Sequence, residues 1–276
     1  MPEGDTIFRA ARTLHRVLAG KTVERFESVY PAVNRIDEDR PLAGQTVESV
    51  ASRGKHLLMT FSGGLVLHTH MRMSGAWHVY RPGERWQRPS REMRVLIAAS
   101  DVVAVGFNIP IAELLSTADL ARHPQLGRLG PDVASDSFDR DLVLRQMRAS
   151  GALAVADALL DQQILAGIGN VLKSEILFVA GVHPFTPVQQ LDHDALGRIL
   201  DVSRRLMKMN VAAPSATSGP RFGRRTTGSL DPSQNLWVYG RGGSACRKCG
   251  CRIQSRKTGL DARLTYWCPT CQRAEG

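Results

Sequence analysis

Four of the five cysteines stand near the C-terminus in two pairs of equal spacing. Two residues separate Cys246 from Cys249, two separate Cys268 from Cys271, and eighteen residues lie between the pairs. Two turns that each present two thiolates are typical of a tetrahedral zinc site, and disulfides are rare in a reducing compartment. The spacing therefore predicts one zinc ion. The fifth thiol, Cys251, could compete with Cys249, but the two matched pairs favour Cys251 as a bystander.

The residues between the two cysteine pairs predict a β-hairpin. The letters Lys-Thr-Gly at 257–259 are a turn signal, and the stretch Arg263–Trp267 alternates polar and apolar residues as a strand does. Such a hairpin would join the two thiolate-bearing turns.

A second group of residues that could take part in chemistry is the Pro2-Glu3 pair, which directly follows the first methionine. Asp5 is a suitable helix cap and Gly20 a suitable stop. Between them, apolar residues recur at helical spacing, namely Ile7, Ala11, Leu14 and Leu18. The pair therefore precedes a packed helix and is held in place. A purely structural interpretation stays open, because proline is common at helix starts, where its missing N–H costs nothing.

A third signal is the stretch Leu165-Ala-Gly-Ile-Gly-Asn170, between an apolar helix that should end near Gln162 and a new helix that begins at Asn170. Gly167 and Gly169 allow two tight turns. A helix N-terminus offers free N–H groups and a partial positive charge, which suit a phosphate. A simple helix hairpin with Asn170 as its cap is the alternative.

The elements that must position these groups change in character along the chain. Up to about residue 110 the sequence predicts short strands, and hence a β-sandwich or barrel. Residues 112–133 are expected to form a connector, and from Phe138 the periodicity becomes helical. The expected fold is α+β: an N-terminal helix with a β-sandwich, then a helical domain, then a zinc hairpin. The predicted strands are 21–29, 46–51, 55–61, 64–71, 76–80, 93–99 and 102–107.

Composition and charge narrow the class of partner. The 276 residues carry a net charge of +10, which favours a polyanion, nucleic acid before anionic membrane. Only 6% of residues are aromatic, which argues against an aromatic-lined groove for single strands. No apolar run is long enough to span a membrane, and no signal peptide is evident, so a cytoplasmic protein is expected.

The segment 213–234 is rich in Gly, Pro, Ser and Arg. It reads either as a solvated linker or as a mobile basic loop in which Arg221, Arg224 and Arg225 contact nucleic acid.

Taken in order, several stretches resemble the formamidopyrimidine-DNA glycosylase/endonuclease VIII family of DNA repair enzymes. They are PEGD at 2–5, SRGKHLLM at 52–59, HMRMSG at 70–75, HPQLGRLGPDV at 123–133, LAGIGNVLKSEIL at 165–177, and VYGRGGSACRKCG followed by ARLTYWCPTCQ in the cysteine region. The resemblance implies a helix-two-turns-helix and a zinc finger. It divides the chain into a catalytic β-sandwich domain (1–115), a connector (116–135), a helical DNA-binding domain (136–240) and a zinc finger (241–276).

The resemblance also implies the chemistry. Met1 is removed, Pro2 becomes the nucleophilic secondary amine, and Glu3 acts as a general acid on the deoxyribose ring oxygen. Lys55, expected on a strand, is a phosphate ligand and proton donor. Arg263, five residues before Cys268, clamps phosphates from the zinc finger and completes the catalytic set.

Further DNA ligands are implied in the same way. Asn170 and Arg128 would bind the backbone, and Glu175 would help to shape the site. In the turn at 70–75, Met73 would fill the gap left by a flipped base and Arg72 would pair with the widowed partner. Without the resemblance, Met73 would read as core filler.

Two departures refine the prediction. The family often has Pro-Glu after its first glycine, where this chain has Asp5 and Thr6. The arginine-arginine-phenylalanine loop of the formamidopyrimidine branch is absent, and VAVGFNIPIAELL stands at 103–115 instead. The endonuclease VIII branch, which favours oxidised pyrimidines, is therefore the closer relative.

The resulting hypothesis is a monomeric, nucleoid-associated glycosylase and abasic-site lyase. Its expected partner is damaged DNA, and no membrane partner is expected. The alternatives are a catalytically weak damage-binding protein on the same scaffold, a glycosylase that prefers 8-oxoguanine or formamidopyrimidine, and a zinc-ribbon protein that binds RNA. The last would leave Pro2 and Glu3 unexplained.

Overall fold

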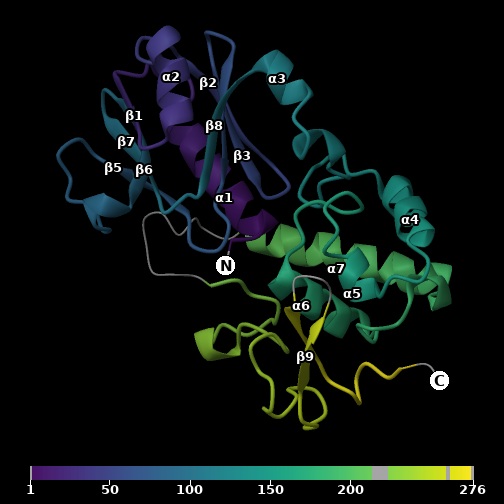
Figure 1. The fold of residues 1–276 in the computed structure, drawn as a ribbon. Helices are drawn as coiled ribbons and strands as arrows, with labels where there is room; N and C mark the ends of the chain where they lie inside the picture. The colour runs from purple at the N-terminus through teal and green to yellow at the C-terminus, as the bar shows by residue number, and fades with distance from the viewer. Residues whose placement is uncertain (1, 213–222, 259–261, 275–276) are drawn as a thin grey trace. The chain divides into compact units, whose positions relative to one another are not determined.

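A computed structural model describes residues 2–212, 223–258 and 262–274. The chain divides into two compact units, one reaching to Arg128 and the other beginning at Leu129, and each unit has its own apolar core (Figure 1).

The first unit opens with helix α1 (Gly4–Leu18). The N-cap is Glu3, whose backbone carbonyl accepts hydrogen bonds from the N–H groups of Thr6 (2.9 Å) and Ile7 (3.0 Å). Asp5 lies inside the first turn and is buried, so its prediction as the cap was wrong. The predicted apolar face is confirmed, because its residues are all buried.

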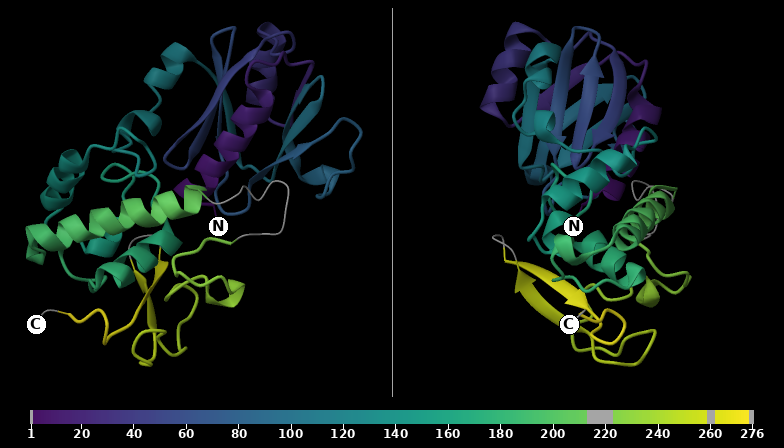
Figure 2. Two further views of the ribbon diagram at one scale, coloured as in Figure 1. Left: turned by 180° about the vertical axis from the view of Figure 1, so that it is seen from behind. Right: turned by 90° about the vertical axis from the view of Figure 1, so that its right-hand side faces the viewer.

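Two four-stranded antiparallel sheets form the rest of this unit, in the orders β1-β6-β7-β5 and β2-β3-β4-β8. Figure 2 shows them as two layers, with α1 packed along one open side of the sandwich next to the edge strand β2. Strand alternation turns one side of each sheet inward, where it buries Leu57, Leu67 and Ile97 with Leu14 of α1. The predicted β-sandwich is confirmed. The strands are β1 (Arg25–Ser28), β2 (Val47–Arg53), β3 (His56–Phe61), β4 (Leu65–His70), β5 (Ala76–Tyr80), β6 (Met93–Ala99), β7 (Val102–Phe107) and β8 (Ile111–Ser116).

Strand β8 corrects the prediction of a connector from residue 112. Its pairing with β4 runs from His70↔Ile111 to Leu65↔Ser116. Glu113 breaks its apolar run and hides the strand signal. Short helices complete the unit, namely α2 (Pro31–Asp39), η1 (Ser90–Glu92), α3 (Thr117–Ala121) and η2 (Leu126–Arg128).

The second unit is helical, with a two-stranded hairpin. Helix α7 buries Leu196, Ile199 and Leu206 against α6, as the periodicity predicts. The helix expected to end near Gln162 is shorter, because α5 ends at Ala158 and turns follow it. The elements are α4 (Arg140–Ala149), α5 (Val155–Ala158), α6 (Asn170–Ala180), η3 (Val188–Gln190), α7 (His193–Ala212), η4 (Pro232–Gln234), β9 (Gln254–Thr258) and β10 (Arg263–Trp267).

Strands β9 and β10 pair antiparallel, from Arg263↔Thr258 to Trp267↔Gln254, which confirms the predicted hairpin. Its tip at 259–261 lies outside the described residues. Within the described ranges, no helix is both long and apolar enough to cross a membrane.

Candidate functional site

Pro2 and Glu3 stand at the start of α1. Pro2 is partly exposed, whereas the side chain of Glu3 is buried at 1% exposure. Because the Glu3 carbonyl caps α1, the backbone of this residue is fixed. Pro2 directly precedes a residue with a buried carboxyl group, and Asp5 and Arg9 are buried on the same helix.

Lys55 lies in the turn of the β2–β3 hairpin and not on a strand, which corrects the prediction. Arg53 of β2 pairs with His56 of β3, so Gly54 and Lys55 form a two-residue turn. Gly54 has φ of 60°, in the left-handed region that such a turn requires. The turn leaves Lys55 partly exposed.

The predicted wedge, residues 70–75, links β4 to β5. Met73 is 69% exposed, whereas Met71, two residues earlier, is 2% exposed and belongs to the core. Arg72 adopts φ of 47°, and its N–H donates to Nδ1 of His70 over 3.0 Å. A Cβ atom on Gly75 would lie 2.7 Å from the carbonyl oxygen of Met71, so this tight turn requires glycine. The turn thus presents an apolar side chain to solvent.

In the second unit, the Gly-rich loop before α6 is fixed by Gln162. Its Oε1 accepts from the N–H of Gly167 (3.1 Å), and its Nε2 donates to the carbonyl of Ile168 (3.1 Å). Gly167 has φ of 102°, and a Cβ atom there would lie 3.1 Å from Cγ1 of Val133. Helix α6 begins at Asn170, as predicted, with Gly169 as its N-cap.

A buried lysine connects this helix start to the hairpin. The Nζ atom of Lys173 donates to Oδ1 of Asn170 (2.7 Å), to Oγ1 of Thr265 (2.7 Å) and to the carbonyl of Leu264 (3.4 Å). Lys173 is fully buried, and β10, which holds Thr265, begins at Arg263. The structure thereby ties Asn170 to the strand of Arg263. Sequence analysis missed Lys173, although a lysine in an apolar helix was a usable signal.

Glu175 occupies a second buried position on α6. Its Oε1 accepts from the N–H groups of Val238 (2.9 Å) and Tyr239 (2.8 Å), and its Oε2 accepts from the N–H of Trp237 (2.8 Å) and from the Thr226 hydroxyl. A carboxylate with this many donors is well compensated for burial. It fixes the segment that leads into the cysteine region.

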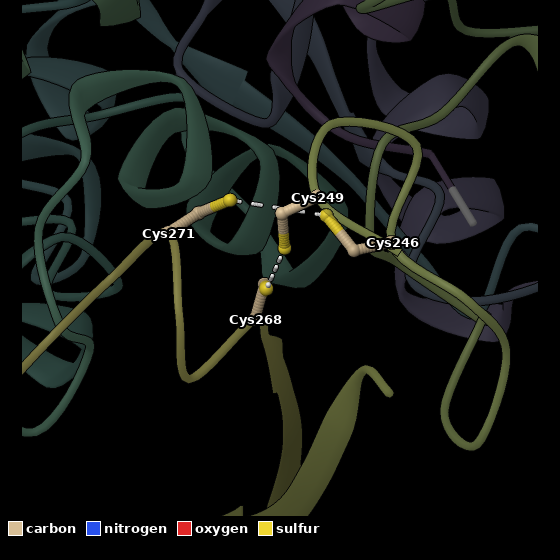
Figure 3. Close-up of side chains that lie close together, drawn as sticks. All are labelled: Cys246, Cys249, Cys268 and Cys271. Carbon is tan, nitrogen blue, oxygen red and sulfur yellow. Dashed lines mark hydrogen bonds between the residues drawn. The ribbon is translucent and has the colours of Figure 1, made fainter. Parts of the chain in front are cut away.

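The four predicted cysteine ligands meet at one point (Figure 3). The Sγ atoms of Cys249 and Cys268 are 3.4 Å apart, those of Cys246 and Cys271 are 3.9 Å apart, and all four lie within 4.8 Å of one another. Tetrahedral zinc with bonds of about 2.3 Å places its sulfurs about 3.8 Å apart. The cluster fits such an ion. Cys251 is exposed and outside the cluster, as predicted.

The thiols of the cluster differ in acidity. A hydrogen bond with the backbone of Cys251 is the largest cause that lowers the pKa of Cys249, to about 7. Burial raises the pKa values of Cys268 and Cys271. A metal must displace protons from the more basic thiols, so binding weakens as pH falls.

Two further predictions concern basic residues. Arg128 ends η2 and is exposed. Arg221 lies outside the described residues, but the part of the basic loop after 222 is held in place. The N–H of Arg225 donates to Oδ1 of Asn210 (2.8 Å), and Nδ2 of Asn210 donates to the Arg225 carbonyl (2.7 Å). These two hydrogen bonds connect this part of the basic loop to helix α7.

Comparison with known proteins gives consistent matches. The "Formamidopyrimidine-DNA glycosylase N-terminal domain" matches residues 1–108, and the corresponding "H2TH domain" matches residues 129–220. A probable endonuclease 8 of Streptomyces coelicolor is 42% identical over 275 residues, covering 99% of this chain and 94% of that protein. A DNA-(apurinic or apyrimidinic site) lyase of Mycolicibacterium smegmatis is 36% identical and covers 99% of this chain and 100% of that protein.

The structure of Lactococcus lactis Fpg in complex with DNA containing an abasic site superposes with a TM-score of 0.82, at 22% identity, over 99% of this chain and 100% of that one. This likeness shows a shared fold. The resemblance predicted from the sequence is confirmed: the chain belongs to the formamidopyrimidine-DNA glycosylase/endonuclease VIII family, with full-length relatives named endonuclease 8.

Proposed function

We propose that this protein is a bifunctional DNA glycosylase and abasic-site lyase of base excision repair. The observation that carries the proposal is the position of Pro2, fixed at the start of a buried helix and followed by the buried Glu3, in a chain of this family. Relatives named endonuclease 8 and DNA-(apurinic or apyrimidinic site) lyase support the same reaction class.

The reaction begins at the Pro2 nitrogen, once Met1 has been removed. An α-amino group has an ordinary pKa of about 7.7–8.0, so part of the population is unprotonated near neutral pH. The nitrogen lone pair attacks C1′ of the damaged nucleotide. The C1′–N bond to the base breaks and its electron pair leaves with the base. The Pro2 nitrogen loses its N–H proton in this exchange, and one proton neutralises the departing base, so that the step balances.

Glu3 would donate a proton to the deoxyribose ring oxygen, so that the ring opens and a cationic iminium joins C1′ to Pro2. The cation acidifies the C2′ proton. Removal of that proton sends its electrons into the C2′–C3′ bond and expels the 3′ phosphate. General acid catalysis by one side chain contributes about 10²–10⁴-fold, so Glu3→Gln should cost a factor in that range.

DNA is held, in this proposal, by groups at turns and element ends. Lys55, Arg128, Asn170 and Arg263 would bind phosphates, because a cation or amide fixed at a turn or helix start loses little entropy on binding. The exposed Met73 would enter the base stack while Arg72 faces the partner of the extruded base.

The four-cysteine cluster would hold one zinc ion, which is structural because all four positions are taken by thiolates. The ion would fix the hairpin that carries Arg263. Catalysis is assigned to residues 1–115, with 116–135 as connector, 136–240 as the helical DNA-binding domain and 241–276 as the zinc finger.

Oxidised pyrimidines are the proposed substrates. Three residues, 108–110, link β7 to β8, in the region where the formamidopyrimidine branch has its arginine-phenylalanine loop. So short a link cannot insert beside the partner base, which leaves the Arg72-Met73 turn as the wedge. Discrimination by the opposing base should therefore be weak.

The proposed enzyme works as a monomer on damaged DNA, in the cytoplasm at the nucleoid. Incubation with a duplex that contains one abasic site tests the function: the wild-type protein should cleave the strand, leave an unsaturated sugar remnant on the 3′ end of the upstream fragment, and leave a phosphate on the 5′ end of the downstream fragment. Tight binding without any cleavage would instead support the alternative, a damage-binding protein.

A further inference from the structure

A row of histidines crosses one face of the sheet β2-β3-β4-β8. The register pairs His56 with His70 and His68 with Glu113. Because alternate residues of a strand point to the same side, these four side chains share a face. His56 and His68 are buried, at 6% and 1% exposure, although neither belongs to the apolar core.

The hydrogen bonds of this row define which ring nitrogens carry protons. Nδ1 of His123 accepts from the N–H of Leu126 (3.2 Å), so its Nε2 is the protonated nitrogen and donates to Oε2 of Glu113 (3.1 Å). Nδ1 of His68 lies 2.7 Å from the same oxygen and must donate to it. Nε2 of His68 is then an acceptor, and Nδ1 of His56, at 2.8 Å, is its donor. The chain thus runs in one direction, from His56 to Glu113.

The charge state of Glu113 agrees with this assignment. Burial alone would raise the pKa of Glu113, but hydrogen bonds and charges from His68 and His123 outweigh it and lower the pKa below its ordinary value. An ionised carboxylate accepts both bonds and donates none. Burial and neighbouring cationic groups keep the pKa of His56 near 3, so this imidazole is neutral.

At the end of the row away from Glu113, His56 and His70 adjoin two turns that carry proposed DNA ligands, the Lys55 turn and the 70–75 turn. His56 directly follows Lys55, whose turn is closed by the Arg53↔His56 pair. His70 accepts the Arg72 N–H, and the rings of His56 and His70 lie edge to face with centroids 4.8 Å apart. The orientation of the His56 ring is therefore linked to the placement of both turns.

We propose that Glu113 and His68 are positioning residues which, through the hydrogen bond that His68 accepts from His56, hold the Lys55 turn in the conformation that binds a DNA phosphate. This inference deepens the proposed function and rests on it. Neither residue touches the reacting atoms in this account, so they act on affinity for DNA more than on the chemical step.

The first measurement reads the tautomers directly. Ring ¹⁵N chemical shifts of the full-length, ¹⁵N-labelled protein should show protonated Nδ1 in His56 and His68, and protonated Nε2 in His123. Glu113→Gln keeps an acceptor oxygen and should preserve this pattern, whereas Glu113→Ala should lose the Nδ1–H preference of His68. A protonated Nε2 in wild-type His68, or a metal-shifted resonance with a second metal ion per chain, would overturn the proposal.

The second measurement follows DNA binding. Glu113→Ala should raise the dissociation constant for a duplex with a stable abasic-site analogue by about 5- to 30-fold, as expected for a positioning effect of about 1–2 kcal/mol. Glu113→Gln should recover most of the affinity, and kcat at saturating DNA should change little. Asp101→Asn, which breaks an exposed ion pair with Lys21 on another loop of the same unit, is the matched control and should behave as wild type.

A double-mutant cycle with Lys55→Ala separates positioning from a general structural role. If Glu113 acts through Lys55, Glu113→Ala should add almost nothing to the loss caused by Lys55→Ala. If the enzyme is active but the affinity losses of Glu113→Ala and Lys55→Ala add fully in the double variant, the positioning role of Glu113 is contradicted while the proposed function stands. A wild-type protein that neither binds nor cleaves abasic DNA would contradict the proposed function, and the tautomer pattern can be read independently of that outcome.

Discussion

The Nζ atom of Lys173 lies 2.7 Å from the Oγ1 atom of Thr265, so a fully buried lysine joins helix α6 to strand β10 across 92 positions of sequence. The same ammonium donates to the side-chain oxygen of Asn170, so the amide nitrogen is the donor group that remains on this side chain. One cation thus organises two proposed phosphate ligands, Asn170 and Arg263.

Replacing this lysine should therefore cost both stability and affinity. Lys173→Met keeps the apolar stem but leaves the Asn170 and Thr265 oxygens without their donor, which should lower the free energy of unfolding by about 1–3 kcal/mol. Urea denaturation measures this loss, and fluorescence anisotropy measures the weaker DNA binding. Lys208→Met, at an exposed position on α7, should change the stability by less than about 0.5 kcal/mol. Equal stability of the two variants would contradict the assigned role of Lys173.

The cysteine cluster should bind one zinc ion per chain. Cys268→Ser removes one thiolate and should release the metal and weaken DNA binding, while the β-sandwich of the first unit stays folded. Cys251→Ser is the matched control, because this thiol lies outside the cluster, and it should keep its zinc. Metal content by mass spectrometry gives the answer. Active wild-type protein without zinc would refute the assignment.

Arg263→Ala separates the metal from the DNA contact. The variant should retain its zinc, bind DNA more weakly and lose about one unit from the slope of log affinity against log salt concentration. Titrations at several salt concentrations test this expectation. An unchanged slope would show that Arg263 does not contact phosphate.

Stability should fall as the pH is lowered from 7 to 5. The folded pKa is about 3 for His56 and about 4 for His70, mainly because of burial and then because of nearby cations, which include Arg72. Unfolded histidines titrate near 6.5, so below that pH the unfolded chain binds protons that the folded chain excludes. The stability that these two neutral histidines contribute is fully present above about pH 6.5. It is lost as the pH falls from there toward the folded pKa values, by up to about 1.4 kcal/mol per pH unit for each histidine.

The groups that face these two rings are Lys55, His68, Arg72 and His123, with Glu113 paired to His68 and His123. Denaturation at a series of pH values should therefore show a shallower slope in His56→Asn than in wild type. His193→Asn, at the exposed start of α7, should leave the slope unchanged. A wild-type stability that is flat between pH 5 and 7 would contradict the buried neutral state.

Much of the fold could be predicted from sequence where the signal is local. Strands β5, β6, β7 and β10 occupy the predicted residues, because each combines apolar or alternating residues with clear turns. Strand β8 was missed because Glu113 interrupts it, and its role appears only when β4 lies beside it. The cap at Glu3 was missed because a backbone carbonyl carries no side-chain signature.

The site divides in the same way. The four cysteines were predictable, since their spacing is local and their ligand chemistry is specific. The partners of Lys173 and His68 were not predictable, because the fold brings Thr265 and Glu113 to them from 92 and 45 positions away. Residue types at a site can be inferred from sequence, whereas the hydrogen bonds that orient them need the tertiary structure.

Oxidised pyrimidines should be better substrates than 8-oxoguanine opposite cytosine. With three residues between β7 and β8, the enzyme has few groups that could read the opposing base, so abasic sites and already unpaired lesions should also be cleaved readily. Single-turnover rates on matched duplexes with thymine glycol, dihydrouracil or 8-oxoguanine test this order. Faster excision of 8-oxoguanine than of both pyrimidine lesions would contradict this order and would support the alternative, a glycosylase that prefers 8-oxoguanine or formamidopyrimidine.

The most direct test of the whole account is borohydride trapping. Borohydride reduces the iminium formed between the enzyme and C1′ of the opened sugar, and so makes the complex permanent. Wild-type protein incubated with an abasic-site duplex and borohydride should give one covalent adduct, which peptide mass spectrometry should locate on Pro2 of a chain that has lost Met1. Pro2→Gly should trap far less, and Lys208→Met should trap like wild type. An adduct on a lysine, or full activity in protein that retains Met1, would contradict the central claim.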